Sequence, residues 1–147
     1  MKNGENMIIQ AKQEHRDEIY HLICILENQT INKDHFIHYY QKAFMNEDIH
    51  LYVYIKDEKV IGFISMYFHH YFHHHQDTGE IVELIVDPHY RGLKIGEQLL
   101  VFIEKIAQER QLEEIELSTS TYRKKAHHFY EVHGYSMNHY NYTKKLK

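Results

Sequence analysis

The chain of 147 residues contains one cysteine, one proline and no tryptophan. A lone Cys24 cannot form an internal disulfide, so the sequence predicts a domain that folds without cross-links in the reducing cytoplasm. The sequence has no apolar run near the roughly 20 residues that a membrane-spanning helix needs. Its first ten residues also lack the apolar stretch of a secretory signal. These absences predict a cytoplasmic protein without a membrane partner.

Charge of one sign is also scarce, because 17 Lys and Arg stand against 21 Asp and Glu, a formal net charge of −4. Without a block of basic residues the chain lacks the phosphate contacts that nucleic-acid binding requires. An apolar share of 43% excludes a disordered chain. The length predicts a single domain over residues 1–147.

Hydrophobic periodicity predicts alternating strands and helices along this domain. The expected strands are residues 7–11, 51–55, 60–68, 80–86 and 115–117, with a last strand or hairpin within 135–146. The expected helices are residues 12–27, 33–45, 95–110 and 124–132. The order β-α-α-β-β-β-α-β-α-β predicts the α/β (α+β) class, with one mixed sheet and helices on both faces.

The segment ELIVDPHYRGLKIGEQLL, which begins at Glu83, carries the most chemical information. A strand ends there, a short loop follows with Arg91, Gly92 and Gly96, and a long helix begins at once. Free backbone N–H groups at a helix start attract anions, and glycines let a phosphate approach the backbone. Taken alone, this pattern also occurs in unrelated nucleotide-binding folds and in plain tight turns.

Two motifs in this order resemble those of the GCN5-related N-acetyltransferase (GNAT) superfamily. The first is an ELxVxP strand end followed by R-x-x-G-x-G/A, which Arg91 and Gly96 match. Lys94 replaces the usual middle glycine and leaves the anion site intact if it adopts an ordinary helical φ. The second motif is A-x-x-F-Y-x-x-x-G-[FY], with Arg123 where Asn is common before it. Its matching residues are Ala126, Phe129, Tyr130, Gly134 and Tyr135.

Most of the chain is similar to the aminoalkylphosphonate N-acetyltransferases. The similarity includes the His-rich connection, GEIVELIVDP, ELSTS, KKAHHFY, EVHGY and the terminal YTKKLK. The resemblance implies the GNAT fold with a mostly antiparallel sheet, acetyl-CoA as cosubstrate, and transfer of acetyl to a small amine that bears a phosphonate. It also implies an association of activity with a divalent metal, and homodimers are common in the superfamily.

The resemblance assigns roles to two parts of the chain. The backbone at the strand end pairs with the pantetheine arm of acetyl-CoA, and an N–H near Ile85 polarises the thioester carbonyl. The loop binds the pyrophosphate, and Tyr130 contacts the cofactor and protonates the departing thiolate; otherwise Tyr130 is a core aromatic. The cofactor-binding residues implied in this way are Leu84, Ile85, Val86, Arg91, Gly92, Leu93, Lys94, Ile95, Gly96 and Tyr130.

An ammonium substrate must lose a proton before it attacks, and Glu80 and Glu83 are the candidate bases. Residues three apart on a strand point to opposite faces unless a bulge intervenes, so we expect only one of them to face the cleft unaided. Either one could instead be a half-exposed strand residue.

Five histidines in FHHYFHHH form a candidate metal site, since neutral imidazoles bind Zn²⁺, Ni²⁺ or Mn²⁺ and a carboxylate could complete the site. The resemblance favours His73 and His74 as ligands. Protonated imidazoles could instead hold a phosphonate directly, and a solvated loop without function is the third interpretation.

The expected function is therefore acetyl-CoA-dependent N-acetylation of a small-molecule amine, with an aminoalkylphosphonate as the specific case. Acetylation of a polyamine, an amino sugar or a protein N-terminus is the alternative within the enzyme class. A non-catalytic acyl-CoA or metal sensor with the same fold is the alternative outside it.

Overall fold

The computed structural model describes residues 6–147. Its strands are β1 (Met7–Gln10), β2 (Ile49–Lys56), β3 (Lys59–His69), β4 (Thr78–Val86) and β5 (Ile115–Leu117). Its helices are α1 (Arg16–Glu27), α2 (Lys33–Phe44), α3 (Ile95–Glu109) and α4 (Lys124–Val132), with short 3-10 turns at Gln13–His15 and Pro88–Tyr90. The chain forms two compact units, of which the first ends at Glu116 and the second runs over Leu117–Lys147.

The five strands form one sheet in the order β1-β2-β3-β4-β5. The first four pair antiparallel. The tight turn between β2 and β3 is made by Asp57 and Glu58, both at positive φ. The chain reaches β5 through the crossover helix α3. Just before β5, the Glu113 N–H donates to the Asp77 carbonyl, and the Gly79 N–H donates to the Glu114 carbonyl. Residue numbers therefore increase in the same direction along both segments. A crossover connection of this kind gives a parallel pair, so the sheet is mixed.

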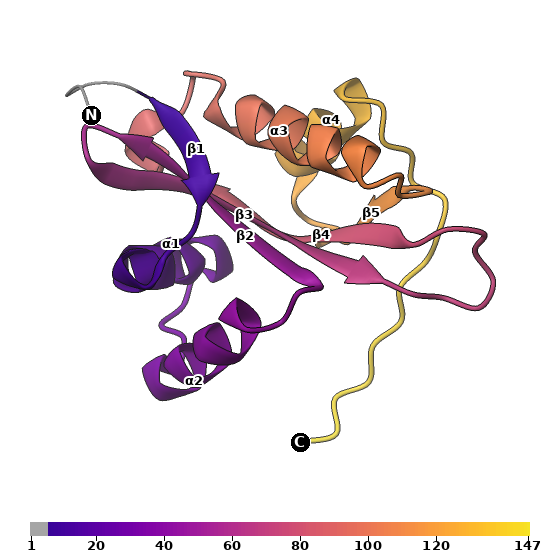
Figure 1. Cartoon of the computed structure of the whole chain (residues 1–147), viewed down its shortest axis with the longest axis horizontal. Coiled ribbons are helices and arrows are strands. Elements are labelled where there is room, and N and C mark those ends of the chain that lie inside the picture. Colours follow the sequence, from indigo (N-terminus) through magenta and orange to yellow (C-terminus); the bar gives the residue numbers. More distant parts are fainter. Residues whose placement is uncertain (1–5) are drawn as a thin grey trace. The chain divides into compact units, whose positions relative to one another are not determined.

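Helices cover both faces of the sheet in the first unit, with α1 and α2 on one side and α3 on the other (Figure 1). On the α1 and α2 face, buried residues of β2, β3 and β4 such as Val53, Phe63 and Ile85 form one core with residues of the two helices. On the α3 face, Gly62 of β3 allows close packing, because an added Cβ would lie 3.0 Å from Cδ1 of Leu99. The period-2 alternation of the strands therefore supplies a core on each face.

Nearly all predicted elements are confirmed, including β5 and α4 with the expected bounds. The last predicted strand is wrong: residues 135–147 contain no strand in the structure. A strand needs a pairing partner and a buried face, but beyond Tyr135 the large apolar side chains of this segment are strongly exposed. They are Met137, Tyr140, Tyr142 and Leu146, with exposed fractions of 86–90%.

Candidate active site

A β-bulge in β4 decides how the two candidate bases are oriented. Ser65 of β3 pairs with Glu83, but the next residue of β3, Met66, pairs with Ile81, so Val82 is the extra residue. One extra residue changes the alternation of side chains along the strand. Glu80 and Glu83 therefore project from the same face. The bulge is the exception under which the sequence analysis expected both carboxylates to share a face.

The shared face is the one that α1 and α2 cover, and here it turns from apolar to polar. Beyond Phe63, β3 continues on this face with Ser65, Tyr67 and His69, which pair with Glu83, Glu80 and Thr78 of β4. The hydroxyl groups of Tyr67 and of Tyr39 from α2 form a hydrogen bond of 2.7 Å. We call the residues Ser65, Tyr67, His69, Glu80, Glu83 and Glu116 the polar strip.

Glu83 is the carboxylate whose surroundings alter its proton affinity. Burial raises its pKa, and the nearby carboxylates of Glu27 and Glu80 raise it further, while the hydrogen bond with Ser65 lowers it. The Ser65 hydroxyl bonds to Glu83 Oε1 and also accepts the Glu83 N–H at 3.0 Å. A carboxyl group that is oriented by a hydrogen bond and has a raised pKa is suited to accept a proton near neutral pH.

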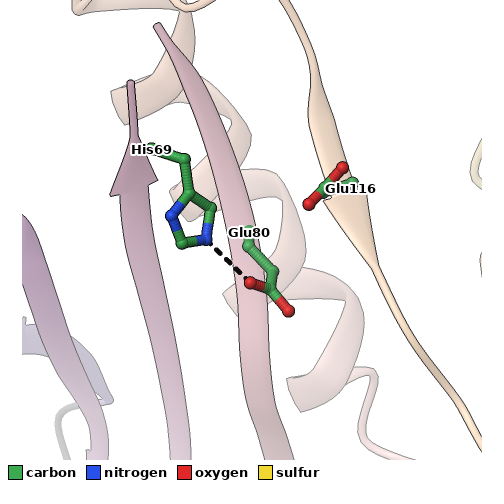
Figure 2. Close-up of side chains that lie close together, drawn as sticks. All are labelled: His69, Glu80 and Glu116. Atoms are coloured by element: carbon green, nitrogen blue, oxygen red, sulfur yellow. Dashed lines mark hydrogen bonds and ion pairs between the residues drawn. The ribbon is translucent and has the colours of Figure 1, made fainter. Parts of the chain in front are cut away.

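Three strands, β3, β4 and β5, bring together three residues of the polar strip: His69, Glu80 and Glu116 (Figure 2). Nε2 of His69 lies 2.8 Å from Oε1 of Glu80. One ligand atom from each of the three residues lies within 4.8 Å of the other two. One imidazole nitrogen with two carboxylates is a donor set that Zn²⁺ and Mn²⁺ accept, so these residues fit a divalent cation.

The predicted ligands His73 and His74 are not placed in such a group. Among residues 6–147, the group of three or more potential ligands is the one that contains His69. Nδ1 of His74 instead lies 2.5 Å from Oε2 of Glu113. Adjacent residues of an irregular connection do not share a direction, whereas residues of neighbouring strands do.

The loop between β4 and α3, which the sequence predicts to bind an anion, is a tight turn from a strand into a helix. Arg91 is extended and exposed, Gly92 has φ +84° and α3 begins at Ile95. Lys94 has φ +59°, which corrects the expectation of a helical φ at this position. A left-handed conformation costs an L-residue roughly 1–2 kcal/mol, and the glycine that the superfamily motif has here would avoid that cost. The first N–H groups of α3 remain without helical partners, as at every helix start.

The backbone predicted to bind pantetheine lies in the second half of β4. Ile64 and Phe63 of β3 pair with Leu84 and Ile85 along one edge. At the other edge, β5 has three residues and β4 has nine, so β5 can pair with only part of β4. This difference in length is compatible with a second, non-protein chain lying along Leu84–Val86.

Tyr130 belongs to the second unit, on α4. Its ring contacts those of Phe129 and Tyr135 at 5.3 and 5.8 Å between centroids. Burial raises the pKa of its phenol, while Arg123 opposes the rise. The phenol therefore keeps its proton at neutral pH.

Sequence reasoning did not identify three members of this region: Ser65, Tyr67 and Glu116. His69 is one of the five histidines of the predicted metal site, although the resemblance favoured His73 and His74 as ligands. Tyr67 follows Ser65 at an interval of two on the predicted strand over residues 60–68, so alternation alone would have placed these two on one face. His69 continues the interval because β3 extends one residue beyond the predicted strand. The position of Glu116 opposite Glu80 depends on the pairing of β4 with β5, for which the sequence has no local signal.

Comparison with known proteins connects this geometry to a family. Residues 13–135 match the model of the acetyltransferase (GNAT) family. The chain is 36% identical over 136 residues to the aminoalkylphosphonate N-acetyltransferase of Salmonella typhimurium, covering 92% of this chain and 88% of that protein.

Solved structures show the same fold at low identity. A transcriptional regulator from Bacillus halodurans superposes with a TM-score of 0.88 at 20% identity, over 97% of this chain and 100% of that chain. An aminoglycoside N-acetyltransferase in complex with CoA superposes with a TM-score of 0.86 at 15% identity, over 99% and 98% of the two chains. Among the described residues, no helix is both long enough and apolar enough to cross a membrane.

Proposed function

Because the chain belongs to the GNAT family and is an N-acetyltransferase, we propose that residues 1–147 form one catalytic domain for acetylating an aminoalkylphosphonate. The relative that is 36% identical is named for its activity on this class of amine. The observation that carries the chemistry is the bulge at Val82, which turns Glu80 and Glu83 toward the same face.

The cofactor, acetyl-CoA, lies along β4 in this proposal. The backbone of Leu84, Ile85 and Val86 bonds to the pantetheine arm. The pyrophosphate meets the loop from Arg91 to Gly96, where the positive end of the α3 dipole and the guanidinium of Arg91 offset its charge. The family's use of acetyl-CoA and the glycine-containing turn at this site support the assignment.

Transfer proceeds by direct attack in a ternary complex. Glu83, assisted by Glu80, accepts a proton from the ammonium group, and the freed lone pair attacks the carbonyl carbon of the thioester. The N–H near Ile85 stabilises the oxyanion of the tetrahedral intermediate. As the C–S bond breaks, Tyr130 donates its phenolic proton to the CoA thiolate. The nitrogen, which became positively charged on attack, gives its second proton through water to the Tyr130 phenolate, and Glu83 releases the first proton to solvent.

A divalent cation would be held by His69, Glu80 and Glu116 in this proposal, instead of by His73 and His74. When bound, the cation would supply positive charge for the phosphonate. Such charge is needed, because the ion pair between Glu80 and His69 is the only one that the carboxylates of the polar strip form among residues 6–147. An acidic strip alone repels an anionic group.

The same charge distribution supports a second candidate, a diamine or polyamine acceptor. The carboxylates of Glu80, Glu83 and Glu116 would attract a second ammonium group directly, without a metal. The two candidates therefore differ in their dependence on a divalent cation.

The test is thiol release from acetyl-CoA with 2-aminoethylphosphonate and with 1,4-diaminobutane, each on EDTA-treated protein and after addition of Mn²⁺ or Zn²⁺. Phosphonate turnover that disappears with EDTA and returns with the metal is the expected result. Phosphonate turnover that survives EDTA would contradict the metal site, and preference for the diamine in both states would favour the second candidate. Absence of turnover with every amine tested would overturn the proposed function.

A further inference from the structure

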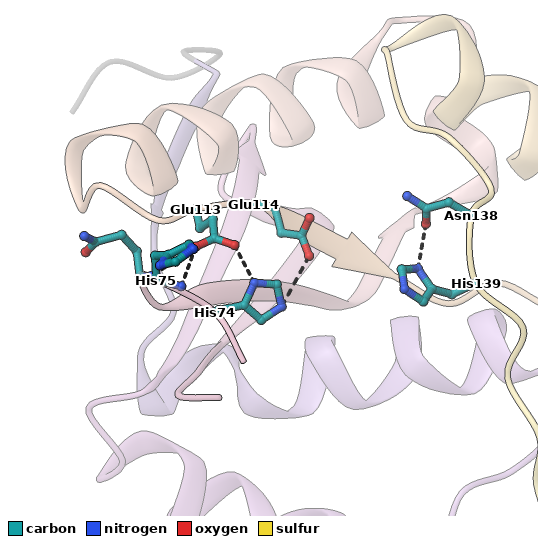
Figure 3. Close-up of polar contacts among 7 residues, drawn as sticks. His74, His75, Glu113, Glu114, Asn138 and His139 are labelled. Atoms are coloured by element: carbon teal, nitrogen blue, oxygen red, sulfur yellow. Dashed lines mark hydrogen bonds and ion pairs between the residues drawn. The ribbon is translucent and has the colours of Figure 1, made fainter. Parts of the chain in front are cut away.

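Glu113 lies just before β5 and forms hydrogen bonds with the connection between β3 and β4, which comprises residues 70–77. Its Oε1 accepts hydrogen bonds from the backbone N–H groups of His75 and Gln76 at 2.8 and 3.0 Å. Its Oε2 lies 2.5 Å from Nδ1 of His74. Its own backbone N–H donates to the carbonyl of Asp77 at 2.8 Å. One exposed side chain therefore holds three consecutive residues of the connection (Figure 3).

The fastened connection leads directly to the polar strip. The ring of Tyr71 lies 5.8 Å from that of His74 and 5.4 Å from that of His69, measured between centroids. His69 in turn bonds to Glu80 at 2.8 Å. A continuous line of contacts thus runs from Glu113 through His74, Tyr71 and His69 to Glu80.

Charge strengthens the first link of this line. The hydrogen bond with Glu113 raises the pKa of His74, and the carboxylates of Glu114 and Glu116 add to the rise. The same contact with His74, together with the hydrogen bonds from the backbone N–H groups of Gln76 and His75, lowers the pKa of Glu113 to about 2. A pair of opposite charges with good hydrogen-bond geometry is stronger than a neutral hydrogen bond.

We propose that Glu113 is a positioning residue for the amine acceptor: it holds the connection over residues 70–77 so that Tyr71 and His69 keep Glu80 oriented toward the acceptor. This inference rests on the proposed function, because Glu80 matters only if the acceptor binds at the polar strip. Glu113 itself touches neither substrate nor cofactor. A residue of this kind affects how the acceptor binds more than how acetyl-CoA binds.

The test compares Glu113→Ala, Glu113→Gln and Glu114→Gln in the full-length chain. Glu114 is the matched control, because it is the adjacent carboxylate and its Oε1 lies 3.7 Å from Nε2 of His74, beyond hydrogen-bond distance. We expect Glu113→Ala to raise KM for the acceptor at least about fivefold, as loosened support of a binding group does. KM for acetyl-CoA should stay within about twofold.

Glu113→Gln separates hydrogen bonding from charge. Its amide oxygen can still accept the two backbone N–H groups, so this variant should recover part of the acceptor KM. Hydrogen exchange of the peptide covering residues 70–77 gives a readout without turnover, and exchange should accelerate in Glu113→Ala but not in Glu114→Gln.

Faster exchange in Glu113→Ala with an unchanged acceptor KM would overturn the positioning role, as would equal effects of the Glu113 and Glu114 variants. Unchanged exchange in Glu113→Ala would show that Glu113 does not hold the connection over residues 70–77. A wild-type protein that acetylates no amine would instead refute the proposed function. The exchange experiment would still report whether Glu113 holds the connection over residues 70–77.

Discussion

Replacement of Glu83 by Gln should lower activity and stabilise the fold at the same time. Gln is nearly isosteric with Glu, so the space beside Ser65 and Tyr67 is kept. The variant cannot accept a proton from the ammonium group, and loss of a positioned base lowers kcat by about 10²–10⁴. KM for acetyl-CoA should be unchanged, because Glu83 is not among the groups that we assign to the cofactor.

The stability effect follows from the raised pKa of Glu83. A carboxyl group whose pKa is higher in the folded than in the unfolded state binds protons more tightly when folded. Its contribution to the free energy of unfolding therefore falls as pH rises from the ordinary pKa of 4.5 to the raised folded value. Each unit of the rise corresponds to about 1.4 kcal/mol of lost stability above that window. Glu83→Gln abolishes this loss.

The assay is urea unfolding of wild type and Glu83→Gln at pH 4.5 and pH 8, combined with kinetics at pH 8. We expect the difference in unfolding free energy to favour the variant more at pH 8 than at pH 4.5, while kcat is lower. Ser65→Ala is the control. It removes the hydrogen bond that lowers the pKa of Glu83, so the pKa of Glu83 should rise further in this variant. A variant that is active and less stable at pH 8 would refute both the role of Glu83 as the base and the account of its pKa.

Two further substitutions test the packing of the sheet and the role of α4. Gly62→Ala adds a Cβ that lies 3.0 Å from Cδ1 of Leu99 and 3.2 Å from Cβ of Tyr54. Overpacking of this kind costs about 1–3 kcal/mol, so Tm should fall by roughly 3–10 °C in a thermal melt followed by circular dichroism, and an unchanged Tm would contradict the close packing of α3 on β3. Tyr130→Phe removes the proposed acid, so kcat should fall at least about tenfold while KM for acetyl-CoA changes little; unchanged kcat would remove that role.

The elements and the turn between β4 and α3 could be predicted from the sequence because they depend on neighbours along the chain. The apolar spacing of α3 fixes its buried face, and Gly134 ends α4 with the expected positive φ. Arg91 stands between β4 and α3 and Gly96 lies in the first turn of α3, and the boundaries of both elements are local properties. Such features need no knowledge of which strand pairs with which.

Only the tertiary structure decided how the polar strip is assembled. The bulge at Val82 is a property of the register between β3 and β4, and it alone brings Glu80 to the face of Glu83. His69, and not His73 or His74, belongs to a group in which the ligand atoms of three residues lie within 4.8 Å of one another, because a regular strand directs its ring toward neighbouring strands while His74 in the connection beyond it bonds to Glu113. Side-chain alternation within a strand is visible in the sequence, but the alignment of one strand on another depends on contacts between residues far apart in the chain.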